Sequence, residues 1–294
     1  MLTLRRLGAL ALVLASLSAQ AQDDPFQAIR TADWQTPQPK AAILTMIRDA
    51  DGDPAKEAEF EAKLVAGLED PATTLSGQYA ITDLLWMVGT ARSVPAVSKL
   101  LAKPELIDVA IYALVNNPSP ESAKALRDAV GKSTGAARIA LVQALGERRD
   151  AAAVAVIKPL LGAEADTATA AAVALGMIGT KDAAEALAAA KTTAPVVRGL
   201  IRAGELLVEA GDLKSAEAAF LKVVGSDAPV PVMAAGLRGL AVSGSKAALT
   251  MCVNVAGGND LYLAKQGARQ AAILQDADTV AKFTAAYPAL KPEV

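Results

Sequence analysis

Two short stretches of the sequence carry residue types whose spacing is compatible with chemistry. The first, "DADGDP", places carboxylates at Asp49, Asp51 and Asp53, an alternation with which a loop can ligate calcium. A loop of the EF-hand type also needs glycine at its sixth position and glutamate at its twelfth, where this chain has Pro54 and Phe60. We therefore interpret the aspartates as a helix-capping turn and expect no metal site.

The second stretch runs from Ser243 to Lys246 and matches S-x-x-K, the nucleophile pattern of penicillin-recognising enzymes. The pattern is so short that about one chance match is expected in a chain of this length. No K-T-G triad follows it. The serine falls at an expected turn between two helices, so we interpret the stretch as a turn.

Histidine is absent from the sequence. That absence excludes Ser-His-Asp and Cys-His catalysis, histidine-containing zinc sites and haem attachment through C-x-x-C-H. The one cysteine, Cys252, cannot form an internal disulfide, and its apolar helical context "ALTMCVNVAG" indicates a small buried hydrophobe. We expect no catalytic residue and no cofactor, and we predict that the chain is not an enzyme.

The N-terminus predicts export. It has a basic start, an apolar run over residues 7–17, and then Ala19 and Ala21 in the small-x-small pattern that a signal peptidase accepts. The run is shorter than the roughly 20 residues that span a bilayer. We interpret residues 1–21 as a cleaved signal peptide and expect a periplasmic or secreted protein.

The charge of the mature chain bears on its partners. Without Arg5 and Arg6 it has 27 basic and 31 acidic residues, a formal charge of −4. Such a chain lacks the basic surface that nucleic acid phosphates require, so we expect no nucleic acid partner. No other uncharged apolar run is long enough to span a bilayer. We therefore expect no membrane insertion after signal cleavage.

Self-comparison shows an internal repeat in which an apolar helix, a short polar turn and an alanine-rich helix follow one another. Successive starts of the second helix are 27 to 32 residues apart, a period typical of a solenoid of helical hairpins. These starts are marked by Ala96, Ala123, Ala152, Ala184, Ala216, Ala247 and Asp278.

Glycine and proline support the same alignment. Glycines follow five of the apolar helices, where a left-handed residue can close the last turn: Gly89, Gly146, Gly179, Gly211 and Gly244. Prolines fall near four expected helix starts: Pro95, Pro120, Pro195 and Pro231. Pro159 lies inside an expected helix, and we predict a bend there.

The segment 169–190, "TAAAVALGMIGTKDAAEALAAA", is almost free of charge and almost free of bulky side chains. A single hairpin cannot bury its apolar face alone, and small residues let neighbouring helices approach closely. We predict that this segment is the tightly packed middle of a stack.

These residues carry a resemblance to a known family. The stretch "AAAVALGMIGTKDAAEAL" resembles the short bacterial HEAT-like repeat associated with phycobilisome lyases. The matching positions are Ala174, Leu175, Gly176, Ile178, Gly179, Ala183 and Leu187. A later hairpin is similar to a tetratricopeptide repeat at Gly204, Ala216 and Phe220. The resemblance covers roughly residues 75–286 and implies a protein-binding scaffold.

The predicted fold class is all-α, an α-solenoid of stacked helical hairpins of the HEAT-like or TPR-like kind. After the signal peptide we expect a polar leader over residues 22–40 and an N-terminal helical cap over residues 41–70. A repeat solenoid of about seven hairpins then fills residues 71–294.

Charged side chains on the second helices do not form one continuous row, because their offsets differ between repeats. These are Lys99, Arg127, Lys158, Lys222 and Lys282. We therefore interpret them as solvated faces.

The resulting hypothesis is an exported, non-catalytic scaffold or adaptor that binds a protein partner on the solenoid surface. The alternative is an accessory subunit of a secreted hydrolase or electron-transfer protein.

Overall fold

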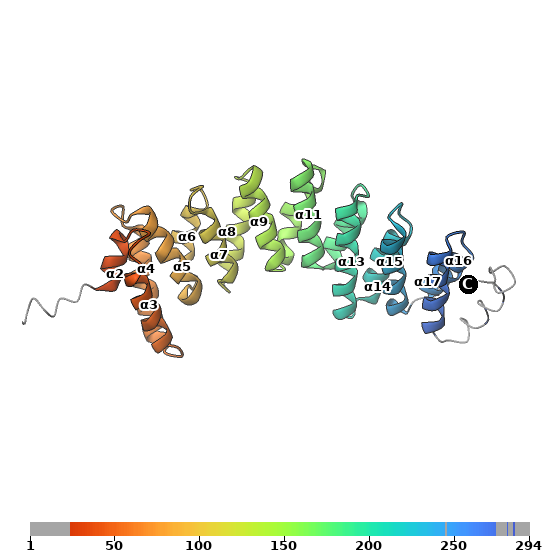
Figure 1. Ribbon diagram of the computed structural model, residues 1–294, viewed down its shortest axis with the longest axis horizontal. Coiled ribbons are helices and arrows are strands. Elements are labelled where there is room, and N and C mark those ends of the chain that lie inside the picture. The colour runs from red at the N-terminus through yellow and green to blue at the C-terminus, as the bar shows by residue number, and fades with distance from the viewer. Residues whose placement is uncertain (1–23, 245, 275–280, 282–284, 286–294) are drawn as a thin grey trace, which may run out of the picture. The chain divides into compact units, whose positions relative to one another are not determined.

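The computed structural model describes residues 24–244 and 246–274, together with residues 281 and 285 (Figure 1). Its described residues form 16 α-helices and three short 3-10 segments, and they contain no strand. The all-α prediction is confirmed. The predicted signal peptide, with Ala19 and Ala21, lies outside the described residues, as do Asp278 and Lys282.

The chain divides into two compact units, with the boundary after Ala125. The elements of the first are α2 (Pro25–Ala28), η1 (Ile29–Thr31), α3 (Gln38–Asp49), α4 (Pro54–Glu69), α5 (Leu75–Val88), α6 (Val94–Leu100), α7 (Ile107–Asn116) and the start of α8 (Pro120–Val130). Those of the second are α9 (Gly135–Glu147), η2 (Ala151–Ala153), α10 (Val154–Ile157), η3 (Lys158–Gly162), α11 (Ala165–Ile178), α12 (Lys181–Ala189), α13 (Ala194–Glu209), α14 (Leu213–Val224), α15 (Val230–Ser243), α16 (Lys246–Ala256) and α17 (Leu261–Ile273).

The first unit is built around α5, which packs against α3, α4 and α7, while α6 packs against α4 and α7. The buried side chains of α5 recur every three or four residues and include Ile81, Leu84, Leu85 and Val88. That spacing gives the helix one apolar face. The other face of α5 is left to solvent.

The N-terminal segment, expected as a polar leader over residues 22–40, forms short helices in its described part. The described part is helical from Pro25 and docked: Phe26 is buried and stacks on Phe60 of α4, with ring centroids 5.6 Å apart. Ile29 is buried in the next turn. Two apolar side chains three residues apart lie on the same side of a helical turn, which is too short a pattern to register as a periodic helix in the sequence.

The first cap helix begins earlier than residue 41, and the second begins directly after its predicted cap residue. Helix α3 already starts at Gln38, and α4 starts at Pro54 after the N-cap residue Asp53. The carboxylate of Asp53 accepts hydrogen bonds from the backbone N–H groups of Ala55 and Lys56, both at 3.2 Å. These bonds lower the pKa of the Asp53 carboxyl, with the Lys56 N–H contributing most. The interpretation of "DADGDP" as a helix-capping turn is confirmed.

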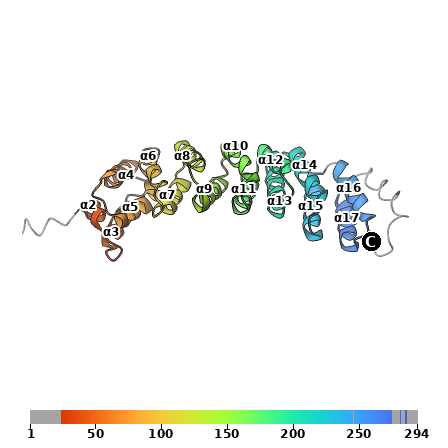
Figure 2. The same ribbon diagram turned by 90° about the horizontal axis from the view of Figure 1, so that it is seen from above.

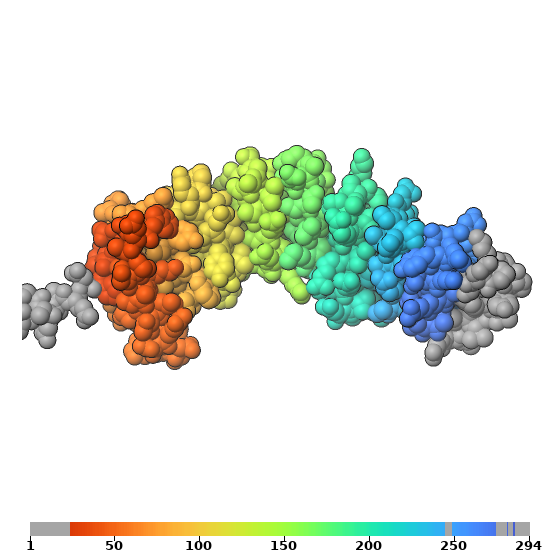
Figure 3. Space-filling view, in the orientation of Figure 1, coloured from red at the N-terminus to blue at the C-terminus, as the bar shows by residue number. Residues whose placement is uncertain are grey.

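The second unit is a succession of hairpins in sequence order. Its first helices pack on one another, α9 on α11, α11 on α13, α13 on α15 and α15 on α17, and the second helices α12 and α14 also pack together (Figure 2). The layers follow one another from green to blue in the space-filling view (Figure 3). The predicted α-solenoid of helical hairpins is confirmed.

Small residues set the separation of these layers. A Cβ atom added to Gly176 of α11 would lie 2.8 Å from the Cα of Gly199 in α13. A Cβ at Gly199 would lie 2.6 Å from the carbonyl oxygen of Ala172, and one at Gly146 would lie 2.8 Å from the Cα of Ala174. Backbone therefore meets backbone across α9, α11 and α13. The close packing predicted for residues 169–190 has this origin.

The hairpin of α13 and α14 contains one large buried side chain. Phe220 is buried, and its ring fills the space left by two glycines: a Cβ at Gly204 would lie 2.7 Å from the ring, and one at Gly239 of α15 would lie 2.3 Å from it. The tetratricopeptide-like pairing of Gly204 with Phe220 is thus a direct contact. The ring packs against both neighbouring helices.

The turn glycines divide into two groups. Gly179, Gly211 and Gly244 have positive φ angles of 64°, 79° and 67°, so they close their helices as predicted. Gly89 has φ −70°, and Gly146 lies inside α9. The prediction is wrong at these two positions. Glycine is needed there because another backbone atom lies close by: a Cβ at Gly89 would lie 2.3 Å from the Leu85 carbonyl oxygen, and one at Gly146 would lie 2.8 Å from the Cα of Ala174.

The prolines behave as expected from their missing N–H group. Those at predicted helix starts lie at the first or second helical position: Pro95, Pro120, Pro195 and Pro231. At Pro159 the chain leaves the α-helix α10 and continues as the 3-10 segment η3. The predicted bend is therefore a change of helix type.

Burial decides the chemistry of the one cysteine. Cys252 is buried in α16, and burial raises the pKa of its thiol to about 11. It is therefore inert as a nucleophile at neutral pH, which confirms its interpretation as a buried hydrophobe. Among the described residues, no helix is both long enough and apolar enough to cross a membrane.

We predict that Gly176→Ala destabilises the protein although alanine is the better helix former. Alanine gains about 1 kcal/mol of helix propensity over glycine, but forcing α11 and α13 apart costs about 1–3 kcal/mol. Urea unfolding followed by circular dichroism should show a lower midpoint. Gly131→Ala is the matched control, because no atom lies within 4 Å of its added Cβ. An unchanged or raised midpoint for Gly176→Ala would contradict the close-packing account.

Candidate functional site

The serine of the S-x-x-K pattern lies at a helix end. The Ser243 side chain is buried at the end of α15, and its hydroxyl donates to the Leu240 carbonyl at 2.7 Å. Gly244 then turns the chain in the left-handed conformation. The serine is thus engaged in a turn, as interpreted. Across the described segments there is no group of three or more Cys, Asp or Glu residues able to hold a metal ion.

The most distinctive surface lies in the first unit and consists of Trp34, Tyr79, Trp86 and Tyr112, which we name the aromatic face. Their exposed fractions are 67%, 37%, 39% and 48%. They form two edge-to-face pairs, Trp34 with Tyr79 at a centroid distance of 5.3 Å and Trp86 with Tyr112 at 5.9 Å. Aromatic residues make up only 3% of the sequence, and both of its tryptophans lie here.

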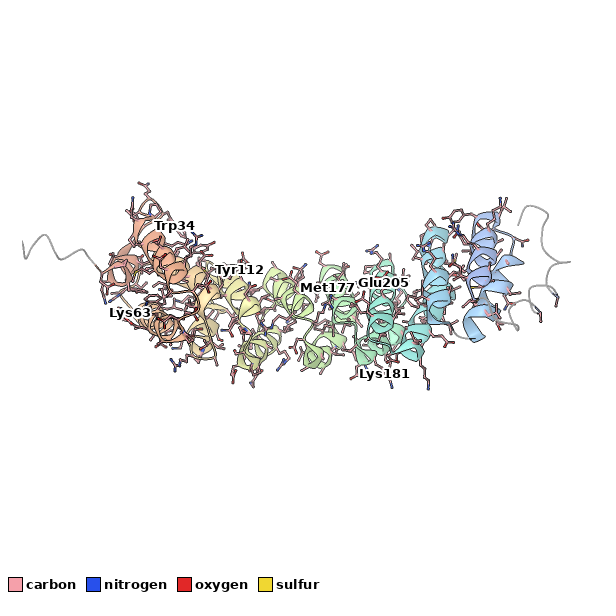
Figure 4. The ribbon with its side chains drawn as sticks, turned by 90° about the horizontal axis from the view of Figure 1, so that it is seen from below. Trp34, Lys63, Tyr112, Met177, Lys181 and Glu205 are labelled. Atoms are coloured by element: carbon pink, nitrogen blue, oxygen red, sulfur yellow. The ribbon has the colours of Figure 1, made fainter. Side chains whose placement is uncertain are left out.

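The geometry of α5 brings the two pairs to one side. Tyr79 and Trp86 are seven residues apart, which is close to two helical turns, so they project from the same face. Tyr112 comes from α7, the helix that packs beside α5. Figure 4 shows Trp34 and Tyr112 on the same side of the first unit and Lys63 on the opposite side.

Hydrogen bonds hold the loop that carries Trp34. The Asp33 carboxylate accepts from the Gln35 N–H at 2.8 Å and from the Thr36 hydroxyl at 3.0 Å, which forms a compact turn. On the other side of the loop, the Thr74 hydroxyl donates to the Ala32 carbonyl at 2.9 Å. Thr74 is the N-cap residue of α5. The loop is therefore fixed to the start of the helix that carries Tyr79.

A second polar network connects the far ends of α5 and α7. The carboxylate of Glu61, 1% exposed, accepts from the backbone N–H of Thr90 at 2.6 Å and from that of Ser93 at 3.2 Å. The amide of Asn117, which ends α7, donates to the Thr90 carbonyl at 2.8 Å. These bonds link α4, the turn after α5 and the end of α7.

Carboxylates accompany the rings. Asp33 precedes Trp34 in the chain, Asp83 lies on α5 between Tyr79 and Trp86, and Asp108 lies one turn before Tyr112 on α7. Lys40 of α3 pairs with Asp83 at 2.5 Å. Residues 24–125 contain 14 acidic and nine basic residues, whereas residues 126–274 contain 13 acidic and 16 basic ones. The aromatic face thus belongs to an acidic unit.

The second unit has no comparable surface among its described residues. Figure 4 shows Met177 of α11 and Glu205 of α13 on one side of this unit and Lys181 on the other. The Arg202 guanidinium pairs with Glu205 at 3.3 Å, so opposite charges neutralise each other on α13. Tyr262 of α17 is exposed without a described aromatic partner. This surface therefore gives no equally specific indication of a ligand.

The second-helix charges form local pairs. Lys99 pairs with Glu69 at 2.9 Å, and Arg127 pairs with Asp150. The interpretation as solvated faces holds for Lys99, Lys158 and Lys222, which are exposed, but not for Arg127, which is half-buried in its pair.

The sequence interpretation missed the aromatic face. The available signal was the spacing of Tyr79 and Trp86, which share one side of α5 while the core positions Ile81, Leu84 and Leu85 occupy the other. The position of Trp34 could not be foreseen, because it depends on a loop fixed by long-range hydrogen bonds.

The described residues fold as an all-α solenoid of helical hairpins. A family model for the PBS lyase HEAT-like repeat matches residues 168–193, which include α12 and most of α11. This match supports a HEAT-like repeat in that part of the chain. The search of curated proteins finds no match.

Among solved structures, the chain is similar to human deoxyhypusine hydroxylase in complex with glycerol. The two share 15% sequence identity at a TM-score of 0.33, over 88% of this chain and 98% of that one. The prediction that the chain is not an enzyme is corrected by this finding, because a hydroxylase has a HEAT-repeat fold. A stack of helical hairpins therefore does not exclude an enzyme.

We predict that Glu61→Ala lowers the free energy of unfolding by about 1–3 kcal/mol, because it removes the buried carboxylate that accepts from the Thr90 N–H and hydroxyl and from the Ser93 N–H. Glu61→Gln keeps one acceptor oxygen and should lose less. The measurement is urea unfolding. Glu59→Ala, on the same helix but exposed and paired with Lys63 at the surface, is the control and should change little. Equal effects at Glu59 and Glu61 would refute the role given to the buried carboxylate.

Proposed function

We propose that the protein is an exported scaffold that binds a protein partner through the aromatic face. HEAT-like repeats generally mediate protein–protein interaction. The single observation that carries the proposal is the concentration of both tryptophans and two tyrosines on one exposed face of the first unit. Tryptophan and tyrosine are the residues most enriched among those that dominate binding energy.

Rigidity of the surface supports the same function. The rings project from α5, from α7 and from a loop hydrogen-bonded to the start of α5. Side chains held in this way lose little conformational freedom on binding, and that preorganisation favours affinity.

The export part of the proposal rests on residues 1–21. We predict that expression in a bacterial host with a secretory pathway yields a mature chain that starts after Ala21. Replacing both Ala19 and Ala21 by arginine should leave the precursor uncut, whereas serine at the same positions should still permit cleavage. Intact mass and N-terminal sequencing of the envelope fraction distinguish these results. A wild-type chain that retains residues 1–21 would contradict export by this signal.

The binding part predicts a specific loss. The double variant Trp86→Ala/Tyr112→Ala should weaken retrieval of the partner by at least about tenfold, because such side chains each contribute more than about 1 kcal/mol at interfaces. The mature chain serves as bait in the native envelope fraction, and each retained protein is quantified. Tyr262→Ala, which removes an exposed tyrosine from the second unit, is the matched control.

Circular dichroism must first show equal helix content and melting for the two variants. A partner retrieved equally by wild type and by Trp86→Ala/Tyr112→Ala would place the binding surface elsewhere and refute the proposal.

A further inference from the structure

We infer that the segment recognised by the aromatic face is cationic and extended, with arginine or lysine side chains that stack on the rings. This inference rests on the proposed function and specifies the chemistry of the partner. It is carried by three features of the first unit: open ring faces, carboxylates beside the rings, and the distance between the two aromatic pairs.

The ring faces attract cations. A cation within about 6 Å of an aromatic centroid gains about 0.5–1 kcal/mol at an exposed site. The same unit contains an internal example, since the ammonium group of Lys63 lies 5.1 Å from the centroid of Phe26. The rings of Trp34 and Tyr112 are about half exposed or more. They are accessible to a side chain from another molecule.

Carboxylates determine the electrostatic character of the aromatic face. Asp33 lies one residue before Trp34 and Asp108 lies one turn before Tyr112, whereas the charge of Asp83, between Tyr79 and Trp86, is offset by a cation. Lys40 pairs with one oxygen of Asp83, and it is the cation that the structure places at this carboxylate. The excess of acidic residues over residues 24–125 acts in the same direction at longer range. An anionic segment would be repelled.

The spacing indicates an extended ligand. Tyr79 and Trp86 are separated by seven helical residues, about 10.5 Å along the axis of α5 at 1.5 Å per residue. In a polyproline II segment, three residues cover about 9.3 Å. A partner segment with a basic residue at every third position therefore places one cation on each aromatic pair. Its backbone conformation is already extended before binding, which limits the entropy lost.

The test uses three synthetic peptides. The first has the sequence Pro-Arg-Pro-Pro-Arg-Pro-Pro-Arg-Pro, and the other two replace every arginine by glutamine or by glutamate. None contains an aromatic residue, so tryptophan emission of the full-length mature protein reports binding. Both tryptophans of the chain lie on the aromatic face, so the signal is local to it. We expect the arginine peptide to bind about tenfold more tightly than the glutamine peptide, and the glutamate peptide not to bind.

Two matched variants test the role of the carboxylates. Asp108 lies in the first turn of α7 and Asp166 in the first turn of α11, so their replacement by asparagine has the same local effect on a helix. Asp108→Asn should weaken the arginine peptide several-fold and leave the glutamine peptide unchanged. Asp166→Asn should alter neither.

The remaining outcomes overturn the inference. Equal affinity for the arginine and glutamine peptides, or no emission change with any peptide, would show that charge is not what the face recognises. A response to chitotetraose in place of the arginine peptide would indicate a carbohydrate ligand. In each of these cases the proposed function is judged separately, by whether Trp86→Ala/Tyr112→Ala loses the partner.

Discussion

Close contact between helix backbones is the constraint on which the second unit depends. Gly176 meets Gly199, and Gly146 meets Ala174, at distances that admit no larger side chain. At these points the dispersion contacts are made between backbone atoms, beside the buried leucine side chains of the same helices. The low aromatic content of the sequence follows from this kind of packing.

The first unit uses its few large side chains differently. Phe26 and Phe60 stack in the interior and fix the N-terminal helices, whereas the aromatic face is left to solvent. Buried polar contacts, above all those of Glu61, then determine how α5 and α7 present that face. Within this unit, packing and polar networks have separate roles: the former stabilises the helices and the latter orients the exposed rings.

The repeat period, the alanine content and the proline positions were sufficient to predict the solenoid, because they reflect local backbone preferences and a regular burial pattern. The glycines were harder, since Gly146 and Gly179 both follow apolar helical stretches and only Gly179 has a positive φ. Whether a glycine serves a turn or a contact depends on the neighbouring helix. The aromatic face was missed for a related reason: Trp34 and Tyr79 are 45 positions apart and meet only after folding.

Phe220 has a consequence for how such a chain can change during evolution. Layers that meet through glycine and alanine are nearly interchangeable, so a hairpin can be duplicated or deleted and the adjoining surfaces still match. The ring of Phe220, by contrast, fits a recess shaped by Gly204 in the preceding helix and Gly239 in the following one. Removal or duplication of one of these three helices alone would leave the Phe220 ring without its recess, so we expect them to be retained as one segment.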